Sequence, residues 1–151
     1  MAKKERLDPD SRIMATQYIR RYRRYKAQLE AERYAILHRS PTPPDGQPRG
    51  TVPGNPTLAA AEALYKLSHT HAAIVVDAIE KSFAAVGEDI LNPYAKNALK
   101  TAIWESCLRN HTHSYESRED ELPIGRRDFY KRKAKFLAEI VERIEVCTFS
   151  A

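Results

Sequence analysis

The sequence predicts an all-α protein, a helical bundle with a C-terminal helix-turn-helix-like element and a Pro/Gly-rich linker after a long N-terminal helix. Three long segments carry apolar residues at spacings of three, four and seven, which is the period of an amphipathic helix. No alternating strand pattern of any length interrupts them. We expect a basic amphipathic helix over residues 1–39, a linker over 40–56 and a helical domain over 57–151.

The first predicted helix begins near Asp10 or Ser11, because either residue is a good N-cap. It ends at about His38, ahead of Pro41. One face of this helix is apolar and mostly aromatic, with Met14, Tyr18, Tyr22, Tyr25, Leu29 and Ile36. A dense basic run flanks that face, with Arg20, Arg21, Arg23, Arg24 and Lys26. Two interpretations are open: the tyrosines pack on the body of the same chain, or they form a dimerisation seam edged by phosphate-binding arginines.

The linker, SPTPPDGQPRGTVPGNP, is rich in proline and holds three of the five glycines, as an extended linker or a surface loop does. Asn55-Pro56 then supplies an N-cap and a proline for the first helical position. We expect one helix or a helix pair from Thr57 to Val86, closed by Gly87. Its predicted buried face comprises Ala61, Tyr65, Ala72, Val75, Ile79, Phe83 and Val86. Asn92-Pro93 repeats the start signal for a helix over about Tyr94–Arg109.

The segment from Leu122 to Lys135 combines a turn with a strongly basic helix start. Pro123 and Gly125 form the turn, and residues 126–135 contain six Lys or Arg and one Asp. Apolar residues then recur at helical spacing, namely Phe136, Leu137, Ile140, Val141 and Ile144. We therefore expect a DNA-reading helix at about 124–146, with its first two turns on DNA and its remainder in a small core.

The segment just upstream of this helix is poor in apolar residues. Residues 113–122 offer only Tyr115 and Leu122, whereas the supporting helix of a helix-turn-helix shows apolar residues every three or four positions. Either a very short helix supports the reading helix, or the segment is a loop and the helix over Tyr94–Arg109 supports it.

Two blocks of the chain resemble the RinA/ArpU-type phage late-gene transcriptional regulators. The first is YKAQLEAERYAILHRSPTPPDGQPRGT…NPT, similar to the tyrosine-rich helix and PPDGxPxGT…DPT-like stretch of that family. The second is LPIGRRDFYKRKAK, similar to the family's ISRRTFYRRRK reading helix. The resemblance brackets most of the chain and implies a C-terminal part like the DNA-reading region 4 of sigma factors. Gly125 stands where the family pattern has a serine N-cap.

The resemblance implies a role for each residue of the basic segment. Ile124 and Phe129 would seat the helix in the core. The residues on the first turns that could reach base edges in the major groove are Arg126, Arg127, Asp128 and Tyr130. The residues expected to meet phosphates and set the register are Lys131, Arg132, Lys133 and Lys135.

The charge distribution agrees with binding to a polyanion. Residues 1–40 carry a net charge of +6, residues 41–120 of −3 and residues 121–151 of +2. A basic arm and a basic tail around an acidic middle suggest two contact surfaces for nucleic acid. Each basic run taken alone is also compatible with a solvated helix face.

Other classes of function lack their signatures. Cys107 and Cys147 are far apart in the sequence and form no CxxC motif. We therefore expect both to be buried or free thiols, as in proteins of a reducing compartment. Residues two apart point in different directions on a helix, so we expect no metal at the histidine pairs His69/His71 and His111/His113. We expect no cofactor and no enzyme activity, and we expect the adjacent acids Glu88-Asp89 to be solvated on a turn. No apolar run approaches the roughly 18 residues of a membrane span, and the N-terminus lacks the apolar core of a signal peptide.

Two functions follow as expectations. The first is a sequence-specific DNA-binding transcriptional regulator, an activator of phage or prophage late genes in the cytoplasm of the bacterial host cell. The alternative is a phage DNA-packaging protein of the terminase small subunit type, which also combines a DNA-binding helical element with oligomerising helices. The expected partners are double-stranded DNA, host RNA polymerase and a second copy of the chain, with no membrane.

Overall fold

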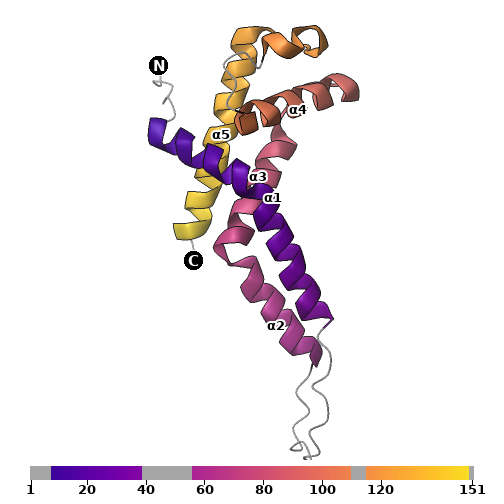
Figure 1. Ribbon diagram of the computed structural model, residues 1–151, viewed down its shortest axis with the longest axis vertical. Coiled ribbons are helices and arrows are strands. Elements are labelled where there is room, and N and C mark those ends of the chain that lie inside the picture. Colours follow the sequence, from indigo (N-terminus) through magenta and orange to yellow (C-terminus); the bar gives the residue numbers. More distant parts are fainter. Residues whose placement is uncertain (1–7, 39–55, 110–114, 150–151) are drawn as a thin grey trace, which may run out of the picture.

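A computed structural model describes residues 8–38, 56–109 and 115–149, and its regular structure there is helical throughout (Figure 1). The described elements are α1 (Pro9–Leu37), α2 (Pro56–Ser68), α3 (His71–Ala85), α4 (Pro93–Arg109), the 3-10 helix η1 (Glu116–Glu121) and α5 (Arg126–Phe149). The predicted all-α fold class is confirmed. The predicted linker lies outside the described residues except for Pro56. None of the described helices has the length and apolarity that crossing a membrane requires.

Prolines mark three helix starts. Pro9 is the first residue of α1 and Asp8 is its N-cap, two or three residues before the predicted N-cap at Asp10 or Ser11. Pro56 and Pro93 begin α2 and α4, as predicted. A proline fits this position because the first N–H groups of a helix have no partner within the helix.

The segment from Thr57 to Val86 is a helix pair, interrupted at His69 and Thr70. The Thr70 hydroxyl accepts a hydrogen bond from the Ala73 N–H at 3.4 Å and so caps the start of α3. Gly87 ends the pair with a φ of 75°, a conformation that glycine adopts at little cost. The break shifts the helical phase, and the predicted buried face is therefore wrong in α2, where Ala61 and Tyr65 are exposed.

The core lies where α1, α3 and α5 pack together, and α4 closes one end of it (Figure 1). The deepest residues of α1 are Ala15 and Ile19, which are 0% and 1% exposed and which the predicted apolar face omits. The predicted tyrosines pack beside them, half-buried against the same core: Tyr18, Tyr22 and Tyr25. Their in-chain packing supports the first interpretation of this helix over a dimerisation seam.

The C-terminal half of α1 and the antiparallel α2 lie side by side and project away from the other helices (Figure 1). A second, smaller cluster holds this hairpin to α3, and its buried members are Leu29, Leu67 and Val76. Cys107 lies in the main core, where burial raises the pKa of its thiol to about 11, whereas Cys147 is exposed on α5. Both thiols are unpaired.

Candidate nucleic-acid interface

Two aromatic rings in the core, those of Phe129 and Tyr115, brace the start of α5. Phe129 is fully buried, and the Tyr115 ring lies 5.7 Å from it, centroid to centroid. The Tyr115 hydroxyl donates a hydrogen bond to the Ile124 carbonyl at 3.0 Å, which ties the turn to the core. The Phe129 N–H donates to the Gly125 carbonyl at 3.0 Å and closes the first helical turn. Ile124 is half-buried against the core, so both residues expected to seat the helix do contact it.

The described part of the segment upstream of this turn forms short 3-10 turns, so it is neither the single short helix nor the plain loop of the two predicted alternatives. Within it, η1 spans only Glu116–Glu121, and Arg118 pairs with Glu105 of α4 at 2.7 Å. The main packing partners of α5 are α3 and α1 rather than α4. The backbone of Arg118 is not helical (φ −132°, ψ 18°), so η1 consists of two short 3-10 turns joined at a kink, and it packs on α4. The helix-turn-helix geometry itself stays a prediction. Residues 113 and 114 lie outside the described residues.

Three cations form a line along the outer face of α5, opposite Phe129 and Phe136. Arg127, Lys131 and Lys135 are spaced by four residues and are all exposed. No ion pair of Arg127 or Lys131 with any other described residue is found, and Lys135 approaches Glu139 only to 3.9 Å. We call these three residues the basic strip. They are the part of the predicted site that the structure presents outward together.

Arg126 flanks the strip on one side and is held within the protein. Its Nε lies 3.0 Å from a carboxylate oxygen of Glu116, and its guanidinium carbon lies 5.8 Å from the Tyr130 ring centroid. The side chain is still 65% exposed. Because the ion pair uses Nε, the two terminal nitrogens of the guanidinium group stay available for a bidentate contact.

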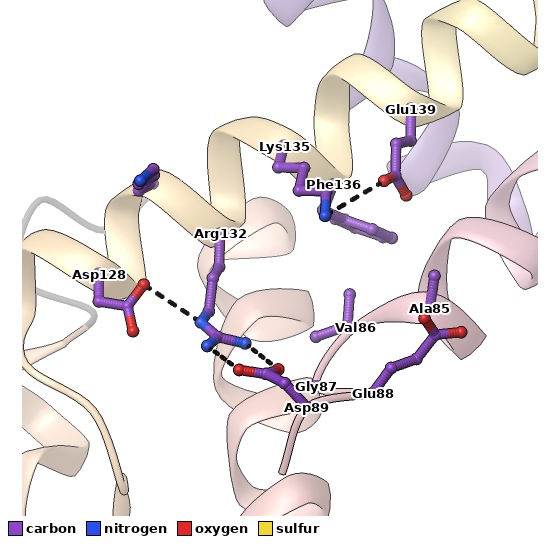
Figure 2. Close-up of a pocket in the computed structure, with 11 residues that line it drawn as sticks. Ala85, Val86, Gly87, Glu88, Asp89, Asp128, Arg132, Lys135, Phe136 and Glu139 are labelled. Atoms are coloured by element: carbon purple, nitrogen blue, oxygen red, sulfur yellow. Dashed lines mark hydrogen bonds and ion pairs between the residues drawn. The ribbon is translucent and has the colours of Figure 1, made fainter.

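Arg132 flanks the strip on the other side and forms an ion pair with Asp89, which is far away in the sequence. Two of its guanidinium nitrogens lie 2.7 and 2.6 Å from the two carboxylate oxygens of Asp89, in the turn after α3 (Figure 2). Its Nε lies 3.2 Å from Asp128 one turn earlier on α5. The hydrogen bonds from Arg132 lower the pKa of Asp89 to about 2.

This bidentate pair lies beside a pocket of about 330 Å³ between α5 and the turn at Gly87–Asp89 (Figure 2). The sequence predicts that Asp89 is solvated on a turn. It is exposed, as expected, but it also pairs with Arg132, 43 residues away. No local pattern could reveal that contact, because only the packing of α5 on α3 brings the two residues together.

The remaining predicted cations have different surroundings. Lys133 is half-buried and close enough to Cys107 to act on the pKa of its thiol. On α1 the whole predicted secondary basic patch is exposed, with Arg20, Arg21, Arg23, Arg24 and Lys26. Lys26 bridges to α3, because its ammonium group lies 3.1 Å from Glu80, which also accepts a hydrogen bond from Tyr22 at 2.7 Å.

The described histidines take part in local contacts. His69 lies 2.8 Å from the Tyr65 carbonyl, and the His71 ring meets the rings of Tyr18 and Tyr25 edge-on. Among the described residues no group of three or more His, Cys, Asp or Glu side chains is placed to hold a metal ion. His111 and His113 lie outside these residues.

Comparison of the chain with protein-family models, with curated proteins and with solved structures found no match in any of the three. The resemblance to the phage late-gene regulators stays a prediction that depends on the two sequence blocks quoted above.

Proposed function

We propose that the protein is a sequence-specific DNA-binding regulator of transcription that places the first turns of α5 in the major groove. The observation that carries this proposal is the outward-facing basic strip on a helix start braced by Tyr115 and Phe129. A major groove about 12 Å wide admits an α-helix, and the helix must hold its side chains in fixed register to distinguish base pairs. A braced helix start meets that requirement better than a mobile tail.

The surroundings of each cation suggest how the contacts divide. Arg126 and Arg127, on the first turn, are suited to bidentate contacts with guanine, the commonest specific contact in the major groove. Lys131 and Lys135 lie one and two turns further along and are suited to phosphates, which set register without reading sequence. Arg132 is held by Asp89 and Asp128, and Lys133 is half-buried, so we assign these two residues little or no share of the phosphate contacts that the sequence predicts.

The finer part of the proposal, activation of phage or prophage late genes through host RNA polymerase, rests on the family resemblance. Gene position separates it from the DNA-packaging alternative. A regulator gene is expected just upstream of the terminase genes, with a binding site in the promoter between them, whereas a packaging subunit is itself the first terminase gene.

Salt dependence tests the DNA interface directly. Each phosphate contact contributes about 0.9 to the slope of log affinity against log salt concentration. Replacing Arg127, Lys131 and Lys135 together by Gln should therefore reduce the magnitude of that slope by about two to three. Fluorescence anisotropy with a labelled duplex at several salt concentrations measures it.

The matched control removes three exposed cations elsewhere, with Lys66→Gln, Lys81→Gln and Arg143→Gln. It changes the net charge by the same amount and should leave the slope almost unchanged. An equal loss in the control would mean that affinity follows net charge and would contradict the proposed interface. The same titration with Arg20→Gln, Arg21→Gln and Arg24→Gln shows whether the duplex also reaches α1.

A further inference from the structure

We propose that Asp128 is a specificity-determining residue of the reading helix, positioned by the Asp89–Arg132 pair to accept a hydrogen bond from the exocyclic amine of a cytosine. This inference rests on the proposed function. It adds a base preference at one position of the binding site, and it gives Arg132 and Asp89 a positioning role in place of direct contact with DNA.

The first support is the place of Asp128 on α5. It is the third residue of the helix and lies beside the basic strip, next to Arg127, with its side chain 46% exposed. An acid among six cations at the start of a reading helix weakens the attraction to phosphates, and a contact with a base offsets that cost. Carboxylates read cytosine in the major groove because the amine on its C4 is a donor there.

The second support is the way the carboxylate is held. One oxygen of Asp128 accepts from Arg132 Nε at 3.2 Å, and Figure 2 draws no interaction between the other oxygen and the residues shown. A carboxylate fixed through one oxygen presents its second oxygen in one direction. It also loses less side-chain entropy on binding than an unrestrained side chain does.

The third support is the anchoring of Arg132 itself. The bidentate contact with Asp89, at 2.7 and 2.6 Å, leaves the Arg132 side chain only 22% exposed. A planar guanidinium group held by two parallel hydrogen bonds has a fixed orientation. With that orientation fixed, the Nε–H of the same group points at Asp128, so Asp89 on the turn after α3 determines the orientation of a side chain on α5.

The experiment starts from a duplex selected by the wild-type protein from a random pool, then varies every position through all four base pairs. The wild type should prefer a C·G pair at one position. Asp128→Ala should reduce the discrimination at that pair by about five- to a hundredfold and leave the other positions unchanged. It should also bind unrelated DNA more tightly, because a negative charge beside the phosphates is removed.

Asp89→Ala tests the positioning role. It should weaken the preference at the same pair although Asp128 is intact, and it should raise the salt slope by about one, because Arg132 is released to meet a phosphate. Asp89→Glu keeps the carboxylate and should restore much of the preference. Glu88→Ala is the matched control, since Glu88 lines the same pocket and makes no hydrogen bond to the other residues drawn in Figure 2.

The outcomes separate this inference from the proposed function. A wild-type protein that selects no sequence overturns the proposed function and this inference with it. A wild type that selects a sequence, with an Asp128→Ala variant whose base preferences are unchanged or whose affinity falls equally on all sequences, overturns this inference alone. An Asp89→Ala variant with unchanged preference and unchanged salt slope overturns the positioning role of Asp89 and Arg132.

Discussion

Replacing Phe129 by alanine should lower the free energy of unfolding by about 3–5 kcal/mol, the usual cost of removing a buried aromatic side chain. Phe129 is fully buried, and its ring contacts two others, with centroid distances of 5.7 Å to Tyr115 and 5.2 Å to Tyr130. The substitution removes these contacts and leaves a cavity under the start of α5. Urea denaturation followed by circular dichroism measures the loss as a lower midpoint with an unchanged slope.

Val146→Ala is the matched control, because Val146 lies near the end of the same helix and is 59% exposed. Its effect should stay within about 0.5 kcal/mol, as for most surface substitutions. A Phe129→Ala protein as stable as the control would show that α5 is not anchored through this ring, which would contradict the proposal that Phe129 holds the start of α5 in place.

Replacing Arg127 by alanine should weaken binding to the preferred DNA site by about 1–3 kcal/mol, provided that Arg127 contacts a guanine through two hydrogen bonds. That range corresponds to a loss of roughly five- to 150-fold. Arg127 is exposed on the first turn of α5, and no ion pair with another described residue has to be broken first. The loss on unrelated DNA should be smaller, because only the phosphate attraction is reduced there.

Lys131→Ala should behave differently and weaken specific and unrelated duplexes about equally, because a phosphate contact carries no sequence information. Arg143→Ala, an exposed cation near the far end of the same helix, should change neither affinity appreciably. If Arg127 and Lys131 both cause equal losses on specific and unrelated DNA, then α5 is a phosphate clamp and does not read sequence.

Much of the fold could be predicted because its determinants are local. Pro56 and Pro93 begin helices, Gly87 ends one, and the spacing of Phe136, Leu137 and Ile140 gives the buried face of α5. The helix break at Thr70 carries no proline or glycine, so its position could not be predicted. The burial of Ala15 and Ile19 depends on how α1 crosses α3 and α5, which the spacing within one helix does not specify.

In the candidate site, too, the local features could be predicted from the sequence and the long-range contacts could not. The six cations at the start of α5 were visible as a run in the sequence, but their surroundings were not. Arg132 and Arg127 have the same side chain, yet one pairs with Asp89 and the other is exposed without an ion pair to the described residues. Long-range contacts such as Arg132–Asp89 and Tyr115–Phe129 follow from tertiary packing, and they determine which cations are paired within the protein and which are exposed.

Selection of duplexes from a random pool by the purified full-length chain tests the central claim most directly. The account predicts one enriched sequence, bound about a thousandfold or more tightly than unrelated DNA at physiological salt, with the enrichment reduced by Arg127→Ala and retained by Arg143→Ala. A bound pool with the same base composition as the input pool, at every salt concentration that permits binding, would contradict it.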